Sequence, residues 1–207
     1  MRSNSDTAGQ GKPSFIEEAR RRQIVETAIH TIATRGYSQA SLAEIARRAG
    51  ISKGVISYHF EGKEELVAEI LSRLLREPTE FIKKRVDAAD RAMDRLRAYV
   101  TANFEFMKTH RDNYVALVDL WESRASGSGN RFGAEAYGPS RTYLSRILET
   151  GHESGEFRDL DQGTVASVIQ ATIDGVMLQW VVEEKAVDLD ACRDQILEMV
   201  TLHVVIR

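Results

Sequence analysis

Apolar residues recur every three or four positions along most of this 207-residue chain, and this spacing is the feature that most constrains its fold. In an α-helix such residues share one face, whereas a half-buried strand needs strict alternation of apolar and polar residues. Alternating runs and continuous β-branched runs are scarce, and the chain contains three prolines. The pattern therefore predicts an all-α fold.

Two short helices are predicted between Ser41 and Phe60. Ser41 precedes one apolar stripe as a capping residue, with Glu44 three residues later, and Ser52 precedes the next. Gly50 lies between the stripes and tolerates a left-handed conformation. A short helix, a tight turn with glycine and a second short helix with a polar face form the helix-turn-helix pattern, in which the second helix enters a major groove.

Longer helices surround this pair. We expect a polar, disordered arm over 1–13, then a helix that begins with a capping box at Ser14 and ends at Gly36. A fourth helix begins near Lys63, and we expect Pro78 to end or kink it. The remaining helical patterns are broken by turn-like segments such as the Gly/Ser-rich connection at 126–130, and they cover residues 90–109, 111–124, 134–151, 161–184 and 188–206.

Charge divides the chain into two parts. The net charge is −3, but residues 1–66 hold 10 Lys and Arg against 8 Asp and Glu, whereas residues 67–207 hold 18 against 23. A basic excess has the sign that a nucleic-acid partner requires, although a charged run is more often a solvated face. We therefore expect a helix-turn-helix DNA-binding domain over 14–66 and a helical domain over 67–207.

The string SLAEIARRAGISKGVISYHFEGKEEL, from Ser41 to Leu66, closely resembles the DNA-binding signature of the TetR family of bacterial transcriptional regulators. The preceding residues follow the order and spacing of that family, and the similarity at motif level covers about residues 16–66. The remainder is similar to the family in length and helical layout alone. The resemblance implies a C-terminal domain that binds a small molecule and dimerises through its last two long helices. Ile173 and Val200 are expected at that dimer interface.

In the resembled family, the polar residues around the turn face DNA, whereas Ile56 and Phe60 belong to the small core. Ser41 and Lys63, both at helix N-termini, would bind phosphates, which positions the protein without specifying sequence. The family commonly has Tyr two residues before the histidine, where this chain has Ser57, so the phosphate contact is expected from a shifted position. The expected DNA-binding residues are Ser41, Lys53, Gly54, Val55, Ser57, Tyr58, His59 and Lys63, with Lys53, Gly54, Val55 and Ser57 as candidates for base edges and Tyr58 and His59 for the backbone. The run Arg20–Arg22 either meets DNA or is a solvated helix start.

Aromatic residues gather on the middle helices with acidic residues among them. Aromatic residues at helical spacing more often belong to the hydrophobic core than to the wall of a ligand site. An Asp in an apolar run more often forms a hydrogen bond between packed helices than a ligand contact. An aromatic cavity with a carboxylate would instead favour a lipophilic cation. The expected ligand-binding residues are Phe104, Tyr114, Asp119, Trp121, Glu122, Tyr137 and Asp174. We expect a change in this cavity to reach the DNA-binding domain through the helix over 63–77.

The motifs of several other classes are absent from the sequence. It has one cysteine, Cys192, and hence no intrachain disulfide or thiolate cluster. Its five histidines lack metal-ligand spacing, and neither HExxH, GxGxxG, GxxxxGK[ST] nor GxSxG occurs. No run of about 18 apolar residues and no secretory signal is found in the sequence. We expect a cytoplasmic protein that is not an enzyme, with no cofactor, metal or membrane partner.

These observations predict a dimeric, ligand-responsive DNA-binding repressor with an operator duplex, a small-molecule effector and a second copy of itself as partners. One alternative is an activator or a sensor of acyl ligands with the same fold. The alternative from another class is a helical small-molecule-binding or catalytic protein whose helix-turn-helix is incidental. Salt-dependent operator binding discriminates these classes.

Overall fold

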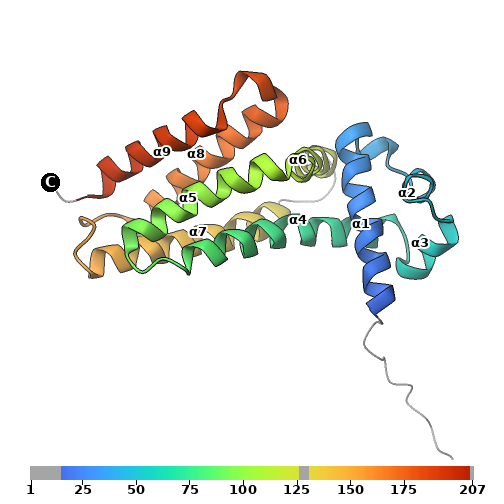
Figure 1. The fold of residues 1–207 in the computed structure, drawn as a ribbon, viewed down its shortest axis with the longest axis horizontal. Helices are drawn as coiled ribbons and strands as arrows, with labels where there is room; N and C mark the ends of the chain where they lie inside the picture. The colour runs from blue at the N-terminus through green and yellow to red at the C-terminus, as the bar shows by residue number, and fades with distance from the viewer. Residues whose placement is uncertain (1–14, 126–130, 206–207) are drawn as a thin grey trace, which may run out of the picture.

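The computed structural model describes residues 15–125 and 131–205, without the side chains of residues 124–125 and 131–137. Within these ranges the chain forms α-helices joined by turns and two short 3-10 helices, which confirms the all-α prediction (Figure 1). The expected arm over 1–13, the Ser14 cap and the connection over 126–130 lie outside the described residues. The elements are α1 (Phe15–Arg35), η1 (Tyr37–Gln39), α2 (Leu42–Ala49), α3 (Lys53–His59), α4 (Lys63–Val86), α5 (Ala92–Thr109), α6 (Arg111–Ala125), α7 (Arg131–Glu153), α8 (Gln162–Val182), η2 (Glu184–Ala186) and α9 (Leu189–Val204).

Local capping explains the two short helices. The Ser41 hydroxyl accepts a hydrogen bond from the Glu44 amide at 3.2 Å, and the Ser52 hydroxyl accepts one from the Val55 amide at 3.3 Å. Gly50 ends α2 with a φ of 68°, in the left-handed region that glycine adopts without strain. The predicted helix-turn-helix is confirmed.

Helix α4 does not end at Pro78, which was one of the two predicted outcomes, because it continues through this residue to Val86. A proline inside a helix costs roughly 3 kcal/mol, since it removes one hydrogen bond and its ring crowds the preceding turn. Ile82 and Val86, beyond the proline, are buried against the C-terminal body, and burying two such side chains contributes about 3–6 kcal/mol. Burial beyond Pro78 thus outweighs the local cost.

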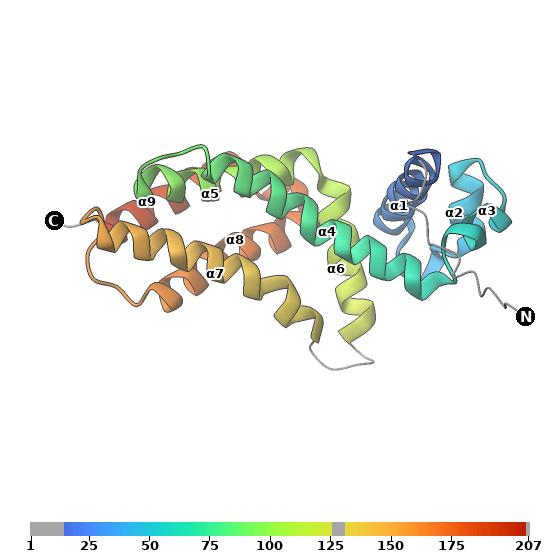
Figure 2. The same ribbon diagram turned by 90° about the horizontal axis from the view of Figure 1, so that it is seen from below.

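The described residues form two hydrophobic cores, and α4 contributes to both. Figure 2 shows α4 extending from α2 and α3 into the body. The first core holds α1, α2 and α3 together and extends along α4 as far as Leu74. It also takes in Ala116 and Leu120 of α6, both fully buried. The N-terminal core therefore does not stop at residue 66, and a helix of the body contributes to it.

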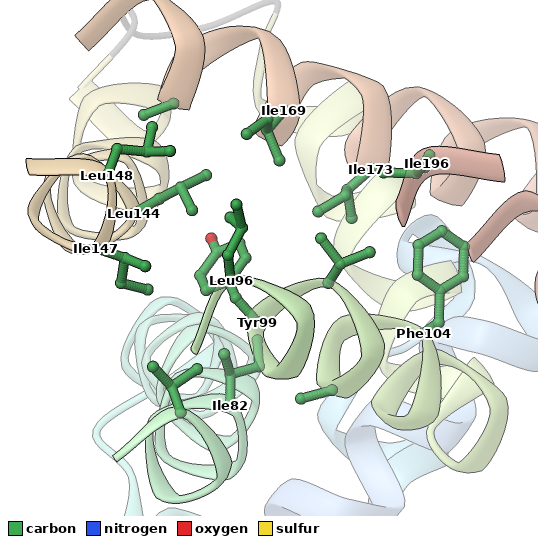
Figure 3. Close-up of a cluster of buried hydrophobic side chains, with 14 of the residues drawn as sticks. Ile82, Leu96, Tyr99, Phe104, Leu144, Ile147, Leu148, Ile169, Ile173 and Ile196 are labelled. Atoms are coloured by element: carbon green, nitrogen blue, oxygen red, sulfur yellow. The ribbon is translucent and has the colours of Figure 1, made fainter. Parts of the chain in front are cut away.

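The second core fills the body between α4, α5, α7, α8 and α9. In Figure 3, Tyr99 of α5 lies near Leu144 of α7, whereas Phe104 lies near Ile173 and Ile196. Ile173 is completely buried there, so its expected place at a dimer interface is wrong: it points inward. Val200 is half-buried and packs against the same core.

Helix α8 is apolar on its outer side as well. Among the described residues it is the one helix long and apolar enough to cross a membrane by length and composition, and 33% of its most apolar window is buried. The sequence pattern did not predict this property. The outer face of α8 is formed by residues at intervals of four and three, namely Thr164, Val168, Ala171, Gly175, Leu178 and Val182. Gly175 is half-buried and the others are exposed, with Val182 at 78%.

Candidate nucleic-acid interface and ligand site

Helix α3 presents a polar face opposite its buried face. Ile56 is completely buried and Phe60, just beyond the helix, is 2% exposed, so these two side chains fix α3 on the N-terminal core. The residues expected at base edges lie away from this core: Lys53, Gly54 and Ser57 are exposed, and Val55 is half-buried. The arrangement leaves the outer side of α3 available to a partner.

Tyr58 and His59 occupy different environments at the end of α3. Tyr58 is 74% exposed, and its hydroxyl donates to the Glu17 carboxylate of α1 at 3.1 Å, which raises the pKa of the tyrosine. Burial lowers the pKa of His59, and the nearby Arg21 adds to this effect. Both effects favour the neutral form of the His59 ring in the protein without a bound phosphate.

Arg21, expected as part of a basic run, has structural partners. Its guanidinium donates to the carbonyl of His59, lies 4.2 Å from the centre of the Phe60 ring and is 3.5 Å from Glu65. Arg20 bonds to Gln23 at 2.6 Å. The structure thus uses Arg21 to join α1 to the end of α3.

Lys63 begins α4 and is held by Tyr37 of η1. Its Nζ donates to the Tyr37 carbonyl at 3.1 Å and lies 4.0 Å from the centre of the Tyr37 ring. A lysine ammonium has three donors, so two remain for a phosphate. This role of Tyr37 was not predicted from the sequence, although Gly36 and Tyr37 follow the spacing of the resembled family.

In the body, Asp174 of α8 carries a carboxylate that is largely removed from water. Burial raises its pKa to about 6, and the hydrogen bond from Gln170 Nε2 at 2.8 Å opposes that rise. Gln170 in turn accepts a bond from the Tyr99 hydroxyl at 2.5 Å. No salt bridge to Asp174 is present in the part of the chain that the structure describes. Gln170, one turn before Asp174 on the same helix, was not among the residues predicted from the sequence.

Two tyrosines lie close to Asp174 from other helices. Tyr99 of α5 and Tyr114 of α6 have pKa values raised first by burial and then by the negative charge of Asp174. Tyr143 of α7 lies next to Tyr99, with 6.4 Å between ring centres. The structure thus brings a carboxylate and aromatic rings from three helices into one region.

The other expected ligand-binding residues are distributed differently. Phe104 is completely buried among the core residues near α9, and Trp121 is half-buried on α6. Glu122 is exposed, and the side chain of Tyr137 lies outside the described residues. Of the expected ligand-binding residues, Asp174 and Tyr114 therefore lie together, and Tyr99, which was not expected, lies beside them.

Asp119 faces the DNA-binding domain rather than the other ligand candidates. Its Oδ2 accepts a hydrogen bond from the Tyr37 amide at 2.5 Å, so it joins α6 to η1. This is a correction to its expected place, and the physical reason is the direction of α6, which packs Ala116 and Leu120 into the N-terminal core. Asp119 follows Ala116 by three residues, so it lies on the neighbouring side of the same helical face.

No group of three or more metal-ligating side chains lies together within residues 15–125 and 131–205.

Comparison with known proteins covers both parts of the chain. Residues 24–70 match the family described as bacterial regulatory proteins, tetR family, and residues 92–204 match the family described as BetI-type transcriptional repressor, C-terminal. A fatty acid metabolism regulator protein from Bacillus subtilis is 27% identical over 192 residues, which cover 92% of this chain and 95% of that protein. The HTH-type transcriptional regulator BetI from Stenotrophomonas maltophilia is 36% identical over 107 residues, which span 51% of this chain and 55% of BetI.

A solved structure with the same overall fold contains a small molecule. It is a transcriptional regulator from Saccharomonospora viridis in complex with choline, 26% identical to this chain. The match covers 92% of this chain and 100% of the other, with a TM-score of 0.81. The likeness extends through both the helix-turn-helix part and the body.

Proposed function

Because the chain belongs to the TetR family of transcriptional regulators, we propose that it is a dimeric repressor that a small lipophilic cation releases from a palindromic operator. Ligand-responsive DNA binding follows from its family and from the regulators that it resembles. The proposed parts are repression, a palindromic operator and a cationic effector. We expect the protein to bind its operator and its effector in the cytoplasm.

The DNA contacts that we propose follow the exposed face of α3 and the helix N-termini beside it. Ser41 and Lys63 bind phosphates, and Tyr58 and His59 also reach the backbone. Base edges are read by Lys53, Gly54, Val55 and Ser57, since these residues lie away from the core formed by Ile56.

Asp174 is the observation that carries the effector proposal. A buried carboxylate without a salt-bridge partner among the described residues is costly, and a bound cation would compensate that cost. The neighbouring rings of Tyr99 and Tyr114 suit an alkylated ammonium, whose charge is attracted by aromatic faces and is more weakly hydrated than that of a primary ammonium. The similarity to a regulator solved with choline supports a quaternary ammonium as the first ligand to test.

The dimer that we propose forms through α8 and α9. Val168, Leu178 and Val182 of α8 are exposed, as are Met199 and Leu202 of α9. A Cβ placed on Gly175 would meet nothing within 4 Å, so the middle of the α8 stripe is open on its outer side. A second copy would cover these apolar residues in a four-helix interface, which accounts for the apolar composition of α8 without a membrane.

Binding of choline to the purified protein tests the effector site. We expect saturable binding by isothermal titration calorimetry and a loss of at least about tenfold in affinity for Asp174→Asn. Glu149→Gln is the matched control, because Glu149 is exposed on α7 and the variant removes the same charge. Equal affinity of wild type and Asp174→Asn would contradict the role of Asp174.

A sensor of acyl ligands is the second candidate function. The observation that favours it is the similarity to the Bacillus subtilis fatty acid metabolism regulator, which spans 92% of this chain. An anionic acyl ligand would have to approach the carboxylate of Asp174 in its protonated form, so its affinity would fall as the pH rises through about 6. A cation shows the opposite dependence, and titrations with choline and an acyl anion at two pH values separate the candidates.

A further inference from the structure

Lys63 is held in place by another residue of the DNA-binding domain. The Tyr37 carbonyl and ring both hold its ammonium group. A phosphate contact made by a flexible lysine costs side-chain entropy, and a lysine that is already oriented avoids part of that cost. The affinity of Lys63 for phosphate therefore depends on where Tyr37 lies.

Tyr37 is held from its other side by the body. Asp119 of α6 accepts the Tyr37 amide, and this bond joins residues 82 positions apart in the chain. Gly36, just before Tyr37, has a φ of 82°, and a Cβ at that glycine would be 3.9 Å from the Asp119 carboxylate. Asp119 thus fixes the first residue of η1, while Lys63 binds the carbonyl of the same residue.

Helix α6 connects this contact to the helix that carries Asp174. At its N-terminus, Arg111 forms an ion pair with Glu184 at 3.0 Å and donates to the carbonyl of Val181 at 3.4 Å. Its guanidinium also lies 5.6 Å from the centre of the Trp180 ring of α8. A shift of α8 would therefore reach α6 directly, and α6 packs beside α1 in Figure 1.

We propose that Asp119 is a positioning residue for DNA binding: through Tyr37 it orients Lys63 toward the operator phosphate, and it transmits a movement of α6 to that contact. The inference rests on the proposed function, since it needs an operator phosphate for Lys63 to bind. It replaces the expected route through α4 alone with a route through α6 and η1. In this proposal Asp119 acts through Tyr37 and Lys63 and contacts neither the effector nor DNA itself.

A double-mutant cycle between Asp119→Ala and Lys63→Ala tests this coupling, with fluorescence anisotropy on a duplex selected by the wild-type protein from random sequences. We expect Asp119→Ala to weaken binding about three- to tenfold in the wild-type background and less than about twofold in the Lys63→Ala background. The salt dependence adds a second readout. Each single variant should reduce the slope of log K against log salt, by up to about 0.9 for each phosphate that Lys63 no longer neutralises.

Asp112→Ala is the matched control, because Asp112 is also a carboxylate on α6 that reaches the DNA-binding domain. It pairs with His30 of α1 at 2.7 Å, a contact that does not involve Tyr37 or Lys63. We expect its effect on DNA affinity to add to that of Lys63→Ala. Asp119→Asn retains a carbonyl acceptor for the Tyr37 amide, so it should restore most of the affinity and serve if the alanine variant unfolds.

Additive effects of Asp119→Ala and Lys63→Ala, with an unchanged salt slope for Asp119→Ala, would overturn the inference and leave a purely structural role for Asp119. The wild-type protein distinguishes this failure from failure of the proposed function. If wild type binds its duplex in a salt-dependent way but the effects of Asp119→Ala and Lys63→Ala are additive, the coupling is wrong and the proposed function stands. If the wild-type protein selects no duplex, both the proposed function and the coupling are wrong.

Discussion

At the scale of the residue, Gly54 is a position at which folding and DNA binding place different requirements on the side chain. It is exposed in the first turn of α3, and a Cβ there would meet the Ser52 hydroxyl at 3.6 Å, an ordinary contact. Alanine is thus compatible with the free protein. The packing of the free chain therefore does not require a glycine at this place, whereas a close approach of DNA to the backbone would require one.

We predict that Gly54→Ala leaves the thermal unfolding temperature unchanged or slightly higher, since alanine favours a helix by up to about 1 kcal/mol over glycine. Operator affinity should fall about tenfold, because the added methyl group meets the base edges. Differential scanning fluorimetry and anisotropy measure the two quantities. Unchanged operator affinity would show that the backbone of α3 does not approach DNA at this residue.

The carboxylate of Asp174 makes effector binding depend on pH. Its folded-state pKa of about 6 lies above the ordinary value of 3.8, so the free folded protein takes up a proton at Asp174 as the pH falls through about 6. A cation needs the ionised form. We predict that choline affinity falls about tenfold from pH 7 to pH 5 in wild type and stays level in Asp174→Asn. A level profile in wild type would contradict the assignment.

The raised pKa of Asp174 also affects the stability of the fold, and here the ionised form is the unfavourable one. A raised carboxyl pKa removes stability as the pH rises from the unfolded value of 3.8 through about 6, so the full penalty applies at neutral pH. We predict that Asp174→Asn stabilises the protein at pH 7.5, by up to about 3 kcal/mol. The gain should shrink toward pH 4, as denaturant titrations at both pH values would show. An equal difference at the two pH values would mean that titration of Asp174 is not its cause.

At the scale of the element, α8 is apolar on two sides, one buried and one exposed. Its inner side, with Ile173 and Met177, packs in the core of the body, whereas Leu178 and Val182 remain exposed. Both sides contribute to the apolar composition of the sequence, so composition alone did not separate core from interface. The exposed stripe is the part that a second copy would cover.

We predict that Leu178→Glu weakens the dimer by at least about a hundredfold, because it places an unpaired charge in an apolar interface. Leu178 is 48% exposed, so the monomer should still fold. Sedimentation velocity at micromolar concentration measures the effect. The control is Phe15→Glu, which introduces the same charge at an exposed apolar residue of α1. A dimer that survives Leu178→Glu would place the interface elsewhere.

At the scale of the whole molecule, the parts predictable from sequence are those with local causes. The caps at Ser41 and Ser52 and the turn at Gly50 act within four residues, and the helix-turn-helix followed from them. Pro78 shows the limit, because burial of Ile82 and Val86 against another helix overrode a local rule. Proximity in space was not readable either.

The candidate site shows the same division. Asp174 stood out as a carboxylate within an apolar run, which is a local signal, and the structure places it near Tyr114 as expected. Asp119 carried an equal local signal but faces Tyr37, 82 residues away in the chain. The direction of α6 decides where Asp119 lies, and the packing of Ala116 and Leu120 into the N-terminal core sets that direction.

DNA binding by the helix-turn-helix and cation binding at Asp174 in the body are coupled in the proposed function, and one measurement tests both. A labelled duplex selected by the wild-type protein is titrated at several salt concentrations, with and without choline, and followed by fluorescence anisotropy. We predict a palindromic duplex with half-sites about 34–36 Å apart, affinity that falls steeply with salt, and release by choline in wild type but not in Asp174→Asn. Selection of no preferred duplex, or a complex that choline leaves intact in wild type, would contradict the account.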